Sequence, residues 1–126
     1  MYLILKDVTK YITNTDITVY KVVAITDNKM HAIWQPSRYK YNKLYKLSRR
    51  LRIYKLFDDK VHTIEGFYSF SNLQDAESLK LKYINCNKYV TKVVKCILPK
   101  GTEYYTNNNV IVSNQIKIIE DVSNNK

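Results

Sequence analysis

The stretch DITVYKVVAITDNKMHAIW, residues 16–34, decides the class of fold. Its first part, residues 16–25, is rich in β-branched side chains, which favour the extended backbone of a buried strand. Asp27 and Asn28 then predict a turn, and residues 29–34 predict a second strand that ends before Pro36. This part of the chain therefore predicts a β-hairpin, around which a sheet has to be built.

The rest of the chain continues this β-rich pattern. Apolar and β-branched runs bounded by turn residues predict further strands over residues 61–70 (interrupted at Gly66), 89–98, 102–106, 110–112 and 116–119. The alternation of residues 39–47 also suits an extended ribbon better than a helix.

One helix is expected, over residues 73–83. Ser71 or Asn72 is a suitable cap, because short polar side chains accept hydrogen bonds from the free N–H groups of a first helical turn. Apolar residues then recur at helical spacing: Leu73, Ala76, Leu79 and Tyr83. Runs of strands with one or two helices predict a compact α+β fold with a mostly antiparallel sheet. We expect a single domain over residues 1–126, with a disordered tail at 123–126.

The charge of the chain indicates an anionic partner. Lysine and arginine number 21 against 11 aspartate and glutamate residues, a net charge of +10. Such an excess concerns steering and partners rather than fold. A lysine-, asparagine- and isoleucine-rich composition without functional meaning is the alternative interpretation of the lysines.

The basic excess is greatest in residues 37–56. This segment contains all four arginines and no acidic residue, and its cations alternate with Tyr39, Tyr41, Tyr45 and Tyr54. Either these side chains contact an anionic ligand, or the segment is an edge ribbon kept positive to discourage pairing between sheets.

The sequence lacks the motifs that most enzyme classes require. Two glycines cannot build a phosphate-binding glycine-rich loop, and His31 and His62 belong to no cluster with metal-ligand spacing. Cys86 and Cys96 form neither a disulfide framework nor a metal pair, and we expect reduced thiols. No signal peptide and no apolar run of about 20 residues is present. We therefore expect a cytoplasmic protein without catalytic residues, metal, cofactor or membrane segment.

The residue types that remain suit a nucleotide-like ligand. Aromatic faces stack on bases, guanidinium groups bind phosphate in pairs of hydrogen bonds, and amides and hydroxyls recognise ribose and base edges. Core packing is the alternative role for each aromatic. The candidate binding residues are Phe67, Tyr68, Phe70, Tyr104 and Tyr105, then Arg38, Arg49, Arg50 and Arg52, and finally Thr106, Asn107, Asn108 and Asn109.

The order of these segments resembles a known family. TVYKVV (18–23) comes first, a basic aromatic middle follows, and GFYSFSN (66–72) leads into DAESL (75–79). VVKCILPKGTEYYTNN (93–108) then leads into IVSNQIKII (111–119). Over about residues 16–120 this pattern resembles the phage anti-Thoeris proteins of the first type.

That resemblance implies a function. Members of the family are small sponges that sequester cyclic ADP-ribose isomers made by TIR-domain defence enzymes and release them unchanged. It implies a homo-oligomer, a dimer or an assembly of dimers, in the cytoplasm of the host cell, with ligand enclosed near a subunit interface. Some members also hold cyclic oligonucleotides. The family's aromatic and amide contacts fall on Phe67 or Phe70 and on Asn107 to Asn109, while its arginines fit residues 38–52 in several registers.

Two alternatives stay open at this point. The charge and the interleaved tyrosines also suit a phage accessory protein that binds nucleic acid, although we do not expect nucleic acid as the partner. GFYSFSNLQDAESL, residues 66–79, also resembles the strand and helix of ADP-ribosyltransferase-like folds. A late glutamate of such an enzyme would be Glu120 or Glu103.

Overall fold

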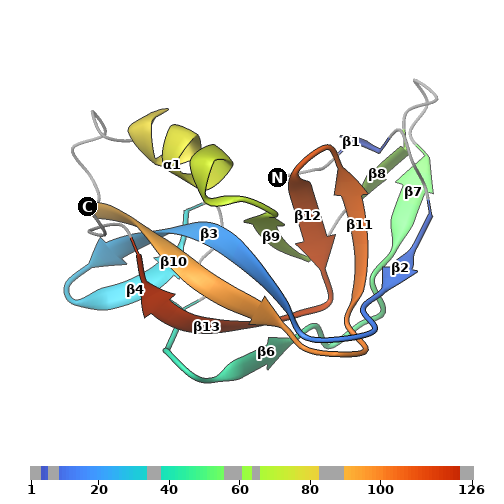
Figure 1. Ribbon diagram of the computed structural model, residues 1–126, viewed down its shortest axis with the longest axis horizontal. Helices are drawn as coiled ribbons and strands as arrows, with labels where there is room; N and C mark the ends of the chain where they lie inside the picture. Colours follow the sequence, from blue (N-terminus) through green and yellow to red (C-terminus); the bar gives the residue numbers. More distant parts are fainter. Residues whose placement is uncertain are drawn as a thin grey trace.

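The computed structural model describes residues 4–5, 9–33, 38–55, 61–63, 66–82 and 90–122. Thirteen strands and one helix are assigned within these ranges (Figure 1). The strands are β1 (Ile4–Leu5), β2 (Tyr11–Ile12), β3 (Ile17–Thr26), β4 (Lys29–Ala32), β5 (Arg38–Tyr39), β6 (Leu44–Lys46), β7 (Ile53–Lys55), β8 (Val61–Thr63), β9 (Phe67–Phe70), β10 (Val90–Leu98), β11 (Glu103–Asn107), β12 (Val110–Ser113) and β13 (Gln115–Asp121), and the helix is α1 (Leu73–Lys82).

Strand β3 is the centre of the main sheet. Along its whole length β3 pairs antiparallel with β10, from Ile17 opposite Leu98 to Ile25 opposite Val90. Its other edge is shared by β4 and, through Tyr20 alone, β9. From β9 the sheet continues to β12, β11 and β2, and from β10 it continues to β13 and β6. Every pairing in the described residues is antiparallel.

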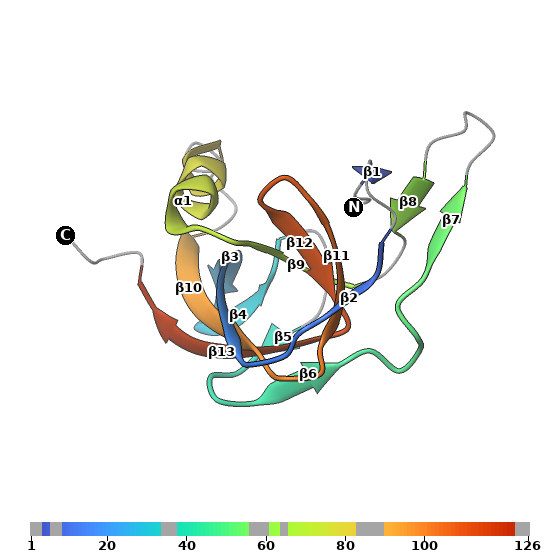
Figure 2. The ribbon, with the colours of Figure 1, turned by 45° about the vertical axis from the view of Figure 1, so that its right-hand side comes forward.

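Part of this sheet curls into a small barrel. Six strands follow one another in the order β5-β4-β3-β10-β13-β6, so β5 and β6 are its two ends. Only residues 40–43 join those ends along the chain, which requires the sheet to bend back on itself (Figure 2). The register between β10 and β13 shifts between Lys95 and Cys96, which leaves Ile119 of β13 as the extra residue of a β-bulge, and this bulge contributes to the curvature.

The barrel interior is the main hydrophobic core. β3 sends alternate side chains to its two faces, as a strand must. Its inward residues pack with the inward residues of neighbouring strands, and the buried members of this cluster are Val19, Val23, Met30, Ala32, Tyr39, Val94, Cys96, Leu98, Ile111, Ile116 and Ile118. The opposite face of β3 and β10 is covered by α1, through Ala76 packed with Val22, Val93 and Val122 (Figure 1).

The hairpin and the helix predicted from sequence are confirmed. Asp27 and Asn28 both have positive φ, 51° and 63°, the conformation that a two-residue hairpin turn requires. Asn72 is the helix cap, because its Oδ1 accepts a hydrogen bond from the Asp75 N–H at 2.9 Å. The predicted ends at Trp34 and Tyr83, the start at Tyr89 and the tail at 123–126 lie outside the described residues.

The strand predicted over residues 61–70, with an interruption at Gly66, is present as two strands, β8 and β9, which belong to different sheets. β8 pairs with β1 and β7 in a separate three-stranded sheet, whereas β9 pairs with β12 and β3 in the main sheet. The chain changes sheets just before β9, where Gly66 has a φ of 149°. A Cβ atom there would lie 2.3 Å from Cγ2 of the fully buried Val112. The glycine is therefore needed both for its conformation and for its lack of a side chain.

Gly66 can be tested against Gly101, which also has a positive φ, 89°, but lies in open space. A Cβ atom added at Gly101 would meet no atom within 4 Å beyond those of its chain neighbours. Gly66→Ala combines backbone strain with overpacking and should lower the free energy of unfolding by about 3 kcal/mol. Gly101→Ala carries the backbone cost alone, about 1 kcal/mol. Urea denaturation of both variants measures the difference, and equal losses would contradict this account of the turn.

Candidate functional site

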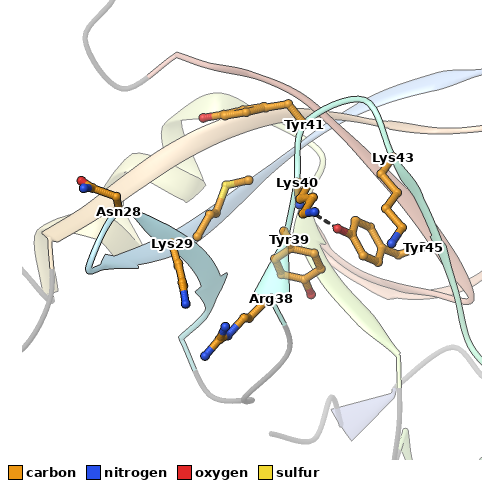
Figure 3. Close-up of a pocket in the computed structure, with 9 residues that line it drawn as sticks. Asn28, Lys29, Arg38, Tyr39, Lys40, Tyr41, Lys43 and Tyr45 are labelled. Atoms are coloured by element: carbon orange, nitrogen blue, oxygen red, sulfur yellow. Dashed lines mark hydrogen bonds between the residues drawn. The ribbon is translucent and has the colours of Figure 1, made fainter.

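An open pocket of about 680 Å³ lies at one end of the barrel (Figure 3). The β3–β4 turn supplies Asn28 and Lys29, and β4 supplies Met30. The other lining residues come from β5, the 40–43 link and β6: Arg38, Tyr39, Lys40, Tyr41, Lys43 and Tyr45. The pocket thus lies where the two ends of the curled sheet meet. Its volume falls within the range of about 300–1,000 Å³ that is typical of sites for drug-sized ligands.

The aromatic floor of the pocket is held in place by specific contacts. Tyr39 and Tyr45 meet edge to face, with ring centroids 5.1 Å apart. The backbone N–H of Lys40 donates a hydrogen bond to the Tyr45 hydroxyl at 2.7 Å (Figure 3). Tyr39 is 4% exposed, whereas Tyr41 is 44% exposed. The first is therefore part of the core, and the second leaves much of its side chain open to solvent.

The charged residues described in the lining of the pocket are all positive. Lys29, Arg38, Lys40 and Lys43 line it and are all exposed, and none of its described lining residues is acidic. Lys43 places its ammonium 5.3 Å from the centroid of the Tyr45 ring, a cation–π contact. Four cations around one open cavity repel one another, and a bound anion relieves that repulsion.

Lys21 lies beneath the pocket floor, inside the barrel. It is 7% exposed, and its Nζ donates a hydrogen bond to the Tyr68 carbonyl at 2.6 Å. The same Nζ lies 5.8 Å from the centroid of the Tyr39 ring. Burial lowers the pKa of Lys21 to about 8.

Burial acts in the opposite direction on the acidic groups beside Lys21. It raises the pKa of the Cys96 thiol to about 12, and it also raises the pKa of the Tyr39 hydroxyl. Both groups are neutral at pH 7. Cys96 is thus a reduced, buried thiol, as predicted from sequence.

A second pocket, of about 320 Å³, lies between α1 and the β11–β12 hairpin. Phe70, Asp75, Ser78 and Leu79 line one side, and residues 107–110 line the other. Asn109 fixes the hairpin to the helix start, because its carbonyl accepts the Ser71 N–H at 2.8 Å and its Oδ1 accepts the Ser71 hydroxyl at 3.1 Å. The described lining of this pocket has an acidic residue and no lysine or arginine.

The predicted aromatic and amide residues divide between the core and this second pocket. Phe70 and Asn107 to Asn109 do share a cavity. Tyr68 and Tyr105 are buried in a second core cluster with Leu51 and Val112, and Phe67 and Tyr104 pack against the barrel core. Tyr104 also stacks on Tyr11 at 5.4 Å. Thr106 closes the hairpin, because its hydroxyl donates to the Val110 carbonyl at 2.8 Å.

The predicted arginines are also separated. Arg38 lines the first pocket, whereas Arg49, Arg50 and Arg52 are exposed and line neither pocket. Among the described residues, the predicted aromatics, arginines and amides do not meet in one cleft. Of the predicted residues, the first pocket contains Arg38, and the second contains Phe70 and Asn107 to Asn109.

Several residues that line the first pocket are not among the binding residues predicted from the sequence: Lys29, Tyr39, Lys40, Tyr41, Lys43 and Tyr45. Their signal was the alternation of cations and tyrosines in residues 38–45. Lys29 had no such signal, because only the hairpin turn brings it beside that segment.

Features of other kinds of site are missing from the described part of the chain. No three histidine, cysteine, aspartate or glutamate side chains within it are grouped closely enough to hold a metal ion. No helix within it is long and apolar enough to cross a membrane. Comparison with protein-family models, with curated proteins and with solved structures finds no significant match to this chain.

The buried ammonium of Lys21 should cost the fold stability. Its pKa is about 8 in the folded chain and 10.5 as a reference for the unfolded chain. Lys21→Met should therefore raise the free energy of unfolding at pH 7 by about 1–3 kcal/mol. Between pH 8 and 10.5 the unfolded wild-type chain binds more protons than the folded one, so wild-type stability rises with pH and the gain from Lys21→Met shrinks.

Urea denaturation at about pH 7 and about pH 9.5, on either side of the folded-state pKa, measures this gain, with exposed Lys46→Met as the matched control. The control should change stability little at either pH. A Lys21→Met variant that is less stable than wild type at pH 7, or whose gain is the same at both pH values, would contradict the cost assigned to the buried charge.

Proposed function

We propose that this protein binds a nucleotide-like anion in the first pocket and keeps it without chemical change. The observation that carries the proposal is the lining itself, which combines Arg38 and three lysines with three tyrosines and has no carboxylate among its described residues. Nucleotides present the complementary groups, an aromatic base and negative phosphates.

Each group has a role in this proposal. The exposed ring of Tyr41 stacks on the base, a contact worth about 1–3 kcal/mol. The Arg38 guanidinium binds phosphate oxygens through paired hydrogen bonds. Lys29, Lys40 and Lys43 supply further charge, while Tyr39 and Tyr45 form a floor that does not need to rearrange on binding. Preorganisation of this kind lowers the entropic cost of binding.

We propose further that the ligand is a cyclic ADP-ribose-type signal, sequestered by a phage protein to block Thoeris immunity in the host cytoplasm. The support is the sequence resemblance together with a pocket that offers stacking surface and several cations for a pyrophosphate. A sponge needs a dissociation constant well below the concentration of the signal. Nanomolar affinity corresponds to about −12 kcal/mol, which stacking and several charge-assisted hydrogen bonds can supply. A homo-oligomer would enclose the open side of the pocket.

One observation favours nucleic acid as a second candidate. Arg49, Arg50 and Arg52 are exposed and continue the basic segment beyond the pocket. Contacts between an extended basic surface and phosphates release counterions, so affinity for a polynucleotide falls steeply with salt.

Binding of cyclic ADP-ribose to single-site variants tests the proposed site. Arg38→Gln should weaken binding by about 10- to 100-fold, because a charge-assisted phosphate contact is lost. Tyr41→Ala should weaken it by about 5- to 100-fold through lost stacking. Arg52→Gln, an exposed arginine outside the pocket, is the matched control and should bind as wild type does. Isothermal titration calorimetry gives the three affinities.

Variants of the second pocket decide where the ligand lies. Phe70→Ala and Asn108→Ala should leave the affinity unchanged if the first pocket is the site. Loss of affinity in these two, with Arg38→Gln unaffected, would move the site to the second pocket. Absence of binding by the wild-type protein would contradict the nucleotide proposal. Binding of a polynucleotide whose affinity falls steeply with the logarithm of the salt concentration would favour nucleic acid instead.

A further inference from the structure

Among the described residues, the ammonium of Lys21 meets no counter-charge inside the barrel. Its contacts there are the Tyr68 carbonyl on β9 and the Tyr39 ring on β5. The other titratable group that faces it is Cys96 on β10, and neither Cys96 nor Tyr39 is ionised at pH 7 because burial raises the pKa of both. An ammonium is seldom buried in a protein without a paired anion.

The same interior contains two unsatisfied hydroxyls. The Tyr39 hydroxyl and the Ser69 hydroxyl are buried and make no hydrogen bond to the described residues. Ser69 follows the residue whose carbonyl binds Lys21, and it pairs across strands with Ile111 of the barrel core. Directly paired residues share one face of a sheet, so Ser69 faces the barrel interior, as Lys21 and Tyr39 do. The barrel interior therefore contains polar groups with fewer partners than a native core normally provides.

Tyr39 connects this interior to the first pocket. Tyr39 is one of the residues that line the pocket, and the centroid of its ring lies 5.8 Å from the Lys21 ammonium. Tyr39 therefore lies beside both the space proposed for the ligand and a buried cation. Charges separated by buried protein groups are screened less than charges in water, because the dielectric constant of a protein interior is much lower than that of water.

We propose that Lys21 is the buried cation of the first pocket, and that a phosphate-bearing ligand bound there is its counter-ion, so that ligand binding and protonation of Lys21 are coupled. Lys21 attracts the ligand electrostatically from beneath Tyr39 and does not contact it. This inference rests on the proposed function, because it needs an anion in the first pocket.

The size of the coupling follows from Coulomb's law. A unit negative charge roughly 10 Å from the ammonium, at an effective dielectric constant of about 20, raises its pKa by about one unit. Starting from a pKa of about 8, the ligand then binds about fivefold more tightly at pH 7 than at pH 9, and binding near pH 8 takes up about 0.4 proton.

Calorimetric titration with cyclic ADP-ribose tests the coupling. Wild-type affinity is measured at pH 7 and pH 9, and proton uptake at pH 8 is measured in two buffers of different ionisation enthalpy. Lys21→Met should bind about tenfold more weakly than wild type at pH 7, less than about twofold more weakly at pH 9, and without proton uptake. Lys40→Met, which removes an exposed lysine of the same pocket, should bind more weakly at both pH values and keep the wild-type proton uptake.

The outcomes separate this inference from the proposed function. Tight binding with no proton uptake, or with equal proton uptake in Lys21→Met, overturns the coupling and leaves the proposed function standing. No binding at any pH overturns both. A second readout uses the ¹³Cε chemical shift of Lys21, titrated by NMR with and without saturating cyclic ADP-ribose: a pKa that rises by about one unit supports the coupling, and an unchanged pKa contradicts it.

Discussion

The contact between Tyr39 and Tyr45 is the constraint on which the site depends. β5 and β6 are the two ends of the curled sheet, and the edge-to-face packing of these rings, 5.1 Å apart, brings the ends together. The Lys40 N–H bond to the Tyr45 hydroxyl and the Asn42 N–H bond to the Ile118 carbonyl, at 2.7 Å each, fix the link between them. Asn42 adopts a φ of 63°, which lets the link turn within a few residues. The same contacts that hold the two ends of the curled sheet near each other therefore shape the floor of the pocket.

The charges around this floor work against stability, and the proposed binding of an anion would account for them. Four exposed cations surround the pocket, and Lys21 places a fifth beneath it at an energetic cost. Among the described residues, a core lysine without a counter-ion and two buried hydroxyls without hydrogen-bond partners depart from the rule that buried polar groups are satisfied. Departures of this kind are expected at functional sites, where the fold gives up stability for a ligand. An anion in the pocket would supply a counter-charge both to the surface cations and to Lys21.

Local patterns in the sequence were enough to predict much of the fold. The β-branched run of β3, the Asp27-Asn28 turn and the Asn72 cap each carry their own physical signal, and the structure agrees with all three. The break before β9 could not be predicted in full, because it depends on the contact between Gly66 and Val112, which are far apart in sequence. For the candidate site, the types of residue were predicted better than their positions in the fold. Tyr68 and Tyr105 carry the same aromatic signal as Tyr41, and only their burial in the core distinguishes them.

The barrel closure also explains why the basic pocket was hard to find in the sequence. Lys29 and Lys43 line the same pocket because two turns lie at the same end of the barrel, a relation that depends on the strand order and not on spacing. Lys21 gave no functional signal, because a single lysine in a strand of valines is uninformative until its partners are known.

The most direct measurement is an aromatic ¹H–¹³C NMR titration of tyrosine-labelled protein with cyclic ADP-ribose. If the nucleotide occupies the first pocket, the ring signals of Tyr39, Tyr41 and Tyr45 should shift, with Tyr41 shifting most, while those of Tyr11 and Tyr104 stay in place. No shift of the three pocket tyrosines at saturating ligand, or shifts confined to other rings, would contradict the account.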